Sequence, residues 1–257
     1  MIFLFFIFGL VVGSFLNVVI YRLASEQSGI ISGRSHCMNC GHELSWRDNI
    51  PIVSYVLLFG KCRYCKSKIS LQYPLVEFFT AIIFVVVAYA SEISFVNNSI
   101  LIAIVMCIIL ASMFVVFIYD FKYMEVPMIA IYIAIALGFL LFYLNNFDFH
   151  SILIRLLSAI TAFSFFFGLS YFSNEEWMGY GDGYIAFVIG LVLSPFWAFV
   201  AILIAVWSGA IIGSILMLIK GKSIKTAIPF GPYLVTGLYL AYFLEHFYPD
   251  FLGFMMI

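Results

Sequence analysis

Two aspartates that border long apolar stretches have the clearest chemical potential in this sequence. Asp120 ends one stretch in Tyr119-Asp120-Phe121-Lys122, and Asp182 lies at the start of another in Gly179-Tyr180-Gly181-Asp182-Gly183. An acid placed inside a membrane helix costs about 2.5 to 3.5 kcal/mol on insertion scales, which favours a functional reason for its presence. Two carboxylates in a low-dielectric cleft do not both ionise easily, so one stays protonated while the other polarises a water molecule for attack on a peptide carbonyl. The pair therefore predicts aspartic-peptidase chemistry.

The surroundings of each aspartate are consistent with that chemistry without requiring it. Glycines at 179, 181 and 183 would let a substrate strand approach Asp182 and would permit backbone angles that other residues avoid. Each acid also has a plainer interpretation: Asp120 as a rim acid paired with Lys122, and Asp182 as the N-cap of the next helix. Four other acids near the same predicted face remain open as members of a proton relay: Glu77, Glu125, Glu175 and Glu176.

Four cysteines form two C-x-x-C pairs, Cys37-Met38-Asn39-Cys40 and Cys62-Arg63-Tyr64-Cys65, with 21 residues between them. This spacing is close to that of a zinc ribbon, in which four thiolates close a tetrahedral structural site. Disulfides or idle thiols are the alternative, but stable disulfides are rare in the cytosol, where we place this loop. His36 and His42 flank the first pair and are left out of the predicted site.

The composition indicates the elements that must position these residues. The chain has 257 residues, of which 65% are hydrophobic and 10% charged, with a mean hydropathy of +1.14. A helix needs about 20 apolar residues to cross a bilayer. We expect eight spans, one of them short, with a break at Ser194-Pro195, and hence an all-α polytopic membrane protein. The nearly charge-free stretches are 2–20, 73–90, 100–119, 126–144, 152–172, 184–219, which is divided in two, and 227–244.

The distribution of basic residues predicts the orientation. Eleven of the twelve Lys and Arg residues fall on one side if the polar loop from Arg22 to Gln72 is cytosolic, and only Arg155 lies near the outer face. Both termini should then face outward. We predict three parts: a first transmembrane helix (1–21), retained rather than cleaved; a zinc-ribbon-like cytosolic domain (22–72); and a seven-helix membrane domain (73–257).

Several motifs in order resemble the type IV prepilin peptidase family of bifunctional leader peptidases and N-methyltransferases. The likeness covers nearly the whole chain: Gly13 to Leu23, Asn49 to Tyr55, Tyr73 to Glu77, Asp120 with Val126-Pro127, the G-x-G-D motif at Gly179 to Asp182, and Pro229 to Pro232. Two positions depart from the pattern. Met128 replaces an acid, and Tyr184 replaces a lysine, so the local charge around the aspartates differs from that of the family pattern.

The resemblance implies cleavage of a short basic leader from prepilins or pseudopilins, followed by N-methylation of the new terminus from S-adenosylmethionine. Asp120 and Asp182 would be catalytic, and the enzyme would lie in a bacterial cytoplasmic membrane with its active site facing the cytosol. Other residues of the shared motifs would contact the substrate or serve methyl transfer: Asn17, Arg22, Glu77, Pro229, Phe230, Gly231 and Pro232. The methyltransferase rests on the resemblance alone, and we expect the cysteine-bearing loop to serve either that activity or substrate docking.

Two other functions remain open from the residues themselves. A transporter could use rim acids as a proton relay, although it would favour acids near the middle of the bilayer. A membrane-anchored zinc module that binds partners would explain the cysteines but not the two aspartates. Membrane lipid is an expected partner, and a nucleic acid is not.

Overall fold

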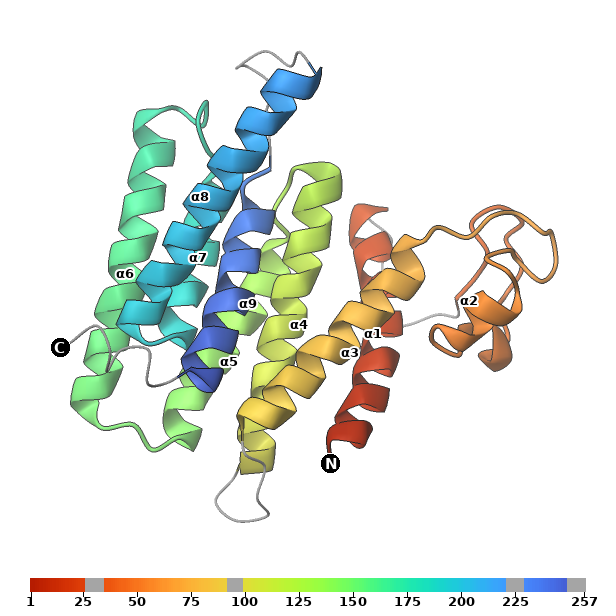
Figure 1. The fold of residues 1–257 in the computed structure, drawn as a ribbon, viewed down its shortest axis with the longest axis horizontal. Helices are drawn as coiled ribbons and strands as arrows, with labels where there is room; N and C mark the ends of the chain where they lie inside the picture. Colours follow the sequence, from red (N-terminus) through yellow and green to blue (C-terminus); the bar gives the residue numbers. More distant parts are fainter. Residues whose placement is uncertain (26–34, 92–98, 221–228, 249–257) are drawn as a thin grey trace. The chain divides into compact units, whose positions relative to one another are not determined.

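The computed structural model describes residues 1–25, 35–91, 99–220 and 229–248, and within these ranges the regular elements are helices (Figure 1). The contacts divide the chain into two compact units, Met1–Ala103 and Ile104–Ile257. Five helices are long and apolar enough to cross a membrane, and two shorter apolar helices accompany them. The predicted all-α membrane fold is therefore confirmed.

The first unit is built on two antiparallel helices, α1 (Ile2–Ala24) and α3 (Gln72–Ala90), which lie side by side in Figure 1. Gly9 and Gly13 of α1 allow this approach, because a Cβ on either would lie 2.6 Å from the Cα of Ala81 or Glu77. Small residues four positions apart are a common way for membrane helices to pack closely. Next along α1, Asn17 donates from Nδ2 to the carbonyl of Tyr73 at 3.1 Å, which fixes the register.

The polar loop between these helices has two short helical segments, η1 (Trp46–Asn49) and α2 (Val53–Leu57). Two isolated β-bridges, His36 with Glu43 and Lys61 with Lys68, close the turns that hold the cysteine pairs. The loop is therefore organised around two similar turns rather than around a sheet.

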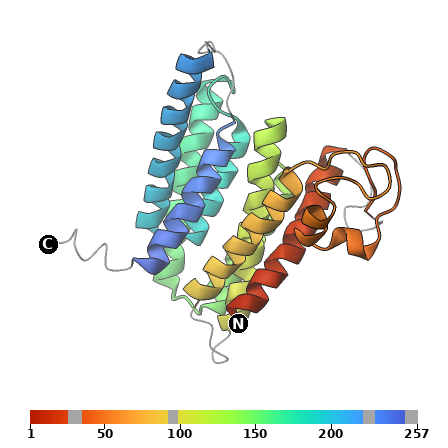
Figure 2. The same cartoon turned by 45° about the vertical axis from the view of Figure 1, so that its right-hand side comes forward.

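The second unit packs five helices with the part of α4 (Ser99–Tyr123) that follows Ala103. These are α5 (Met128–Leu144), α6 (Phe149–Phe172), α7 (Tyr180–Val192), α8 (Pro195–Lys220) and α9 (Gly231–Phe247). Helix α7 is central, since it contacts α5, α6, α8 and α9, and Ile185, Val188 and Ile189 on it are fully buried. Figure 2 shows α8 and α9 side by side within this unit. The predicted break at Ser194-Pro195 is confirmed by the end of α7 at Val192 and the start of α8 at Pro195.

The break between α7 and α8 is held by two charged side chains from neighbouring helices. Arg155 of α6 donates from Nη1 to the carbonyl of Val192 at 2.9 Å, and Glu245 of α9 accepts the N–H of Ser194 at 3.2 Å. The guanidinium also lies 4.9 Å from the centre of the Phe147 ring. A cation at the carbonyl end of a helix is favourable, which explains the one basic residue that the charge pattern places near the outer face.

Candidate active site and metal centre

The two aspartates lie at the ends of different helices of the second unit. Asp120 is in the last turn of α4 and Asp182 is in the first turn of α7, and each is only 5% exposed. Gly179 is the N-cap of α7, and its carbonyl accepts the N–H of Asp182 at 3.2 Å, so the N-cap interpretation of Asp182 is wrong. Lys122 does not pair with Asp120 in the described structure, because its Nζ lies over the Tyr123 ring, 5.2 Å from the ring centre. Both acids therefore lack the plainer role first considered for them.

The start of α9 contacts both helices that contain the aspartates. A Cβ built on Gly231 would lie 2.5 Å from Oδ2 of Asp120 and 3.1 Å from Cδ1 of Ile185, which is one turn after Asp182. Oδ2 of Asp120 is buried and has no hydrogen-bond partner within the described residues. The structure thus places Gly231 against Asp120 of α4 and against Ile185 of α7.

The three glycines around Asp182 have separate roles, and none depends on an unusual backbone angle. Gly179, at the N-cap, has an extended conformation, and neither Gly181 nor Gly183 has a positive φ. A Cβ on Gly181 would lie 2.5 Å from a methyl group of Val126, whereas one on Gly183 would make ordinary contacts with Phe167. The expectation of forbidden backbone angles is therefore wrong. Close packing against the segment that follows Asp120 explains Gly181.

The predicted contact residues Pro229, Phe230 and Pro232 lie just before α9 and in its first turn. Phe230 packs its ring 5.9 Å from that of Phe166 and 6.2 Å from that of Tyr233, between ring centres. Pro232 is buried in the first turn of α9, and Pro229 is half-buried just before it. These residues hold the main chain at Gly231 against Asp120.

One buried serine beside this site was missed from the sequence. Ser170 of α6 is fully buried, and its hydroxyl donates to the carbonyl of Gly179 at 3.0 Å. It thereby fixes the residue at which α7 begins. A polar residue near the end of an otherwise apolar span was the only signal available, and serine is common enough in membrane helices to make that signal weak.

Met128 and Tyr184, the two positions that depart from the family pattern, lie at the start of α5 and in the first half of α7. Tyr184 packs edge-to-face against Phe163, with 5.1 Å between ring centres, and Met128 is the first residue of α5. An aromatic contact thus stands where a lysine was expected. The acids Glu125, Glu175 and Glu176 are exposed rather than buried with the pair.

Three further predicted contact residues belong to the first unit. Asn17 and Glu77 are buried between α1 and α3, and Arg22 is buried in the last turn of α1. Oδ1 of Asn17 has no hydrogen-bond partner within the described residues. Roles for these three in substrate binding or methyl transfer stay predictions.

The four cysteines of the loop do come together. Their Sγ atoms all lie within 4.8 Å of one another, and those of Cys37 and Cys65 are 3.8 Å apart. Tetrahedral zinc with Zn–S bonds of about 2.3 Å requires sulfur atoms separated by about 3.8 Å. All four thiols are free rather than joined as disulfides. The arrangement fits a closed four-thiolate site.

The two cysteine turns have the same main-chain pattern. Cys37 N–H donates to His42 and Cys62 N–H donates to Ser67, at 2.9 and 2.8 Å. The residue after the second cysteine of each pair has a left-handed conformation, with φ of 69° at Gly41 and 59° at Lys66. This repetition turns the cysteines of both pairs toward one point.

The surroundings shift the pKa values of the thiols in different directions. A hydrogen bond from the Ser67 hydroxyl lowers the pKa of Cys65 to about 6. A backbone hydrogen bond at His42 acts to lower the pKa of Cys40, but burial and the neighbouring thiols prevail and raise it to about 11. A divalent cation would favour the thiolate form of every ligand.

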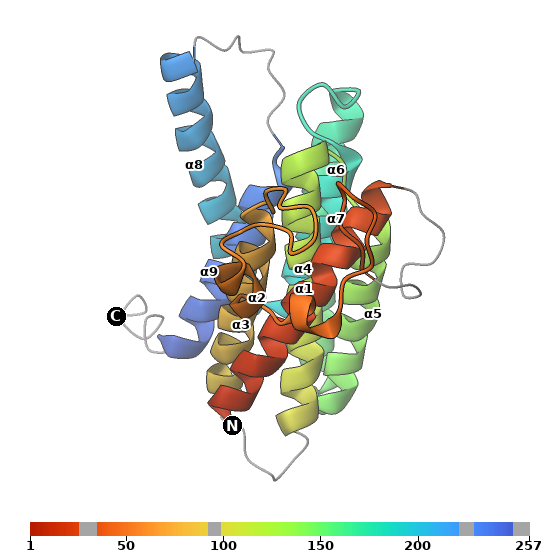
Figure 3. The same cartoon turned by 90° about the vertical axis from the view of Figure 1, so that its right-hand side faces the viewer.

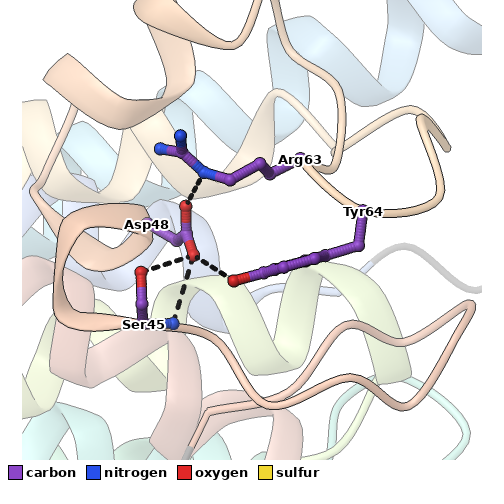
Figure 4. A network of polar contacts seen from close by, with 4 residues as sticks. All are labelled: Ser45, Asp48, Arg63 and Tyr64. Atoms are coloured by element: carbon purple, nitrogen blue, oxygen red, sulfur yellow. Dashed lines mark hydrogen bonds and ion pairs between the residues drawn. The ribbon is translucent and has the colours of Figure 1, made fainter.

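Asp48 ties the second cysteine turn to η1, as Figure 4 shows. Its carboxylate accepts hydrogen bonds from Arg63 Nε at 2.6 Å, from Ser45 Oγ at 2.8 Å and from the Tyr64 hydroxyl at 3.3 Å. Burial opposes ionisation, but the hydrogen bonds from Arg63 and Ser45 prevail and lower the pKa of this carboxyl. The acid braces the two residues between Cys62 and Cys65.

Comparison with known families matches both units. Residues 7–91 match the bacterial peptidase A24 N-terminal domain, and residues 107–214 match the type IV leader peptidase family. No solved structure matches the chain.

Three proteins named prepilin leader peptidase/N-methyltransferase are similar to the chain. The one from Pseudomonas aeruginosa is 30% identical over 264 residues, covering 91% of this chain and 87% of the relative. The one from Vibrio cholerae is 41% identical over 144 residues, covering 53% of this chain and 54% of the relative. The one from Myxococcus xanthus is 52% identical over 79 residues, covering 31% of this chain and 23% of the relative. The chain thus aligns with about half of the Vibrio relative and with less than a quarter of the Myxococcus relative.

Proposed function

Because the chain belongs to the type IV leader peptidase family, we propose that it is an intramembrane aspartic peptidase that cleaves prepilin or pseudopilin leaders. Asp120 and Asp182 are its catalytic residues. The observation that carries this assignment is the burial of both acids, together with the contact of Gly231 with Asp120 and with Ile185, one turn after Asp182. Family membership does not favour a transporter or a zinc-dependent interaction module. The multi-pass helices and the family place the protein in the bacterial inner membrane.

The reaction uses one proton held between the two carboxyl groups. The ionised carboxylate takes a proton from a water molecule as the water oxygen attacks the scissile carbonyl carbon. The protonated carboxyl gives its proton to the carbonyl oxygen. Collapse of the tetrahedral intermediate breaks the C–N bond, and the departing amine takes a proton from the acid that had accepted one. As the C=O bond of the new carboxyl group forms, one hydroxyl of the intermediate returns its proton to the other carboxylate. Both acids return to their starting state.

The position of the acids within their helices supports a cytosolic active site. Asp120 lies at the end of α4 that precedes Lys122, and the loops assigned to the same side contain most of the basic residues of the chain. Basic residues favour cytoplasmic loops. The acids lie at that rim, where a leader peptide enters from the cytosol.

Zinc held by Cys37, Cys40, Cys62 and Cys65 gives the loop a rigid core. A four-thiolate zinc is closed to substrate, so it supplies folding energy rather than chemistry. N-methylation of the new terminus from S-adenosylmethionine is the second activity, and the names of the relatives are its support. This methyl donor is a substrate of that reaction.

The test is a cleavage assay with purified protein in lipid vesicles, a synthetic prepilin peptide and S-adenosylmethionine. Mass spectrometry of the product reports leader loss and methyl addition separately. Asp120→Asn and Asp182→Asn should each abolish cleavage, since neither amide can exchange the proton. Asp148→Asn is the matched control, because Asp148 is an exposed acid at the start of α6.

The variants must also insert and fold, which thermal unfolding in detergent measures. Cleavage that survives either catalytic substitution in a folded protein would remove that aspartate from the mechanism. Cleavage without methyl addition in the wild-type protein would leave the peptidase assignment intact and refute the second activity.

A further inference from the structure

An exposed apolar patch lies on the cysteine-bearing loop, at α2 and the turn after it. We call Val53, Val56, Leu57 and Phe59 the apolar tip. Leu57 is 71% exposed and Phe59 is 89% exposed, and the other two are also exposed. A contiguous exposed apolar surface of this kind marks a binding or membrane surface.

The tip lies at the depth of the transmembrane helices, not beyond their ends. The N–H of Ile52, the residue just before α2, donates to Oε2 of Glu77 at 2.7 Å. Glu77 packs against Gly13 of α1, where a Cβ would lie 2.6 Å from its Cα. Gly13 precedes Arg22, the charged residue at the end of α1, by nine positions, which corresponds to about 14 Å along a helix. The main chain at Ile52 therefore lies within reach of one glutamate side chain from the part of α3 that packs on Gly13.

The figures agree with this depth. Figures 1 and 3, which differ by a quarter turn, both show α2 beside the middle part of α1 rather than past its end. Helices α1, α2 and α3 all belong to the first unit. An apolar tip at this level faces acyl chains once α1 and α3 span a bilayer.

The main chain of this segment is satisfied in the way that lipid demands. Backbone N–H groups inside the hydrocarbon must find partners within the protein, since no water is available there. The N–H of Ile52 donates to Glu77. Six later N–H groups donate to carbonyls of residues 50 to 58, and they belong to Ser54, Val56, Leu58, Phe59, Gly60 and Lys61. A solvated loop would not need partners at this density.

The charges that follow the tip fit the return of the chain to the membrane surface. Four exposed basic residues come within nine positions after Phe59: Lys61, Arg63, Lys66 and Lys68. Basic side chains next to an apolar segment reach toward anionic headgroups. No basic residue lies between Ile50 and Gly60.

From these contacts we infer that Ile52 to Phe59 is a re-entrant element embedded in the lipid bilayer, with Glu77 as its anchor. The loop that contains the cysteines is then only partly cytosolic. Lipid acyl chains surround the apolar tip. The metal site then lies close to the lipid headgroups.

Photo-crosslinking in vesicles tests this inference. p-Benzoylphenylalanine replaces Phe59 in the full-length protein, which is reconstituted in vesicles of phosphatidylethanolamine and phosphatidylglycerol and illuminated. The same probe at Phe199, an exposed residue of α8, is the positive control, and at Met38, an exposed residue of the first cysteine turn, the negative control. Adducts are identified by mass spectrometry, and each variant is first checked for leader cleavage.

We expect phospholipid adducts at position 59 at a yield similar to that at position 199 and several-fold above that at position 38. A yield at position 59 no higher than at position 38, with position 199 labelled normally, would overturn the inference. Adducts at position 59 with protein alone would also overturn it, and would identify a second chain or another protein surface as the occupant. None of these outcomes depends on the assignment of the catalytic aspartates.

Discussion

Replacing Gly231 with alanine should separate catalytic geometry from stability. The new Cβ would lie 2.5 Å from Oδ2 of Asp120, against an ordinary contact of 3.4 Å or more. The nearest atoms, Oδ2 of Asp120 and Cδ1 of Ile185, are both ends of side chains that can rotate. We therefore expect the carboxylate to move by about 0.9 Å, and a misplacement of about 1 Å at a reacting group costs about 100-fold in rate.

The expected result is a kcat about 100-fold lower, equivalent to about 2.7 kcal/mol of transition-state stabilisation, with KM nearly unchanged. The melting temperature should fall little, since side-chain rotation relieves the clash. Gly168→Ala is the matched control, because a Cβ there meets nothing within 4 Å. Cleavage kinetics on a prepilin peptide and thermal unfolding in detergent measure the two effects. A kcat for Gly231→Ala equal to that of Gly168→Ala would refute the claim that Gly231 sets the position of Asp120.

Three other changes test separate parts of the structure. Arg155→Ala should lower the free energy of unfolding by about 1 to 3 kcal/mol, because the Val192 carbonyl loses its donor; an unchanged melting temperature in detergent would contradict this. Gly41→Ala should speed zinc release to a chelator about fivefold, since a left-handed φ costs a residue with a Cβ about 1 kcal/mol; a rate equal to that of wild type would show that the turn tolerates alanine. Asp48→Asn should weaken hydrogen-exchange protection of the loop at pH 7. The pKa of Asp48 is lowered by folding, so its contribution is present above the unfolded value of about 3.9 and is lost as the pH falls through the lower folded value; a difference between wild type and variant that grew on acidification would have the wrong sign.

The sequence predicted the membrane helices well because their apolar runs match the length of a bilayer. It placed their ends less well, since charge was used as the boundary. Helix α1 continues to Ala24 because Arg22 is buried within it, and α7 begins at Tyr180, so that Asp182 lies inside the helix and not before it. A helix whose first turn contains an acid and two glycines has no apolar signature at that turn.

The site was predictable where spacing determines contact, and less so where tertiary packing does. Two C-x-x-C pairs predict a metal cluster from the chain alone. The approach of Gly231 to Asp120 and the bond from Ser170 to Gly179 depend on how separate helices pack. The sequence does not predict the apolar tip, because Val53 to Phe59 is too short for a span and lies within a polar loop.

The shortness of α7 bears on how water reaches a peptide bond inside a membrane. Its 13 residues extend about 20 Å, against about 30 Å for the hydrocarbon core. Because α7 is enclosed by α5, α6, α8 and α9, it meets protein rather than lipid, and one of its ends stops short of the membrane surface. Because Arg155 and Glu245 secure the far end of α7, that deficit falls on the end with Asp182. Water then has to pass between the longer neighbouring helices to reach Asp182.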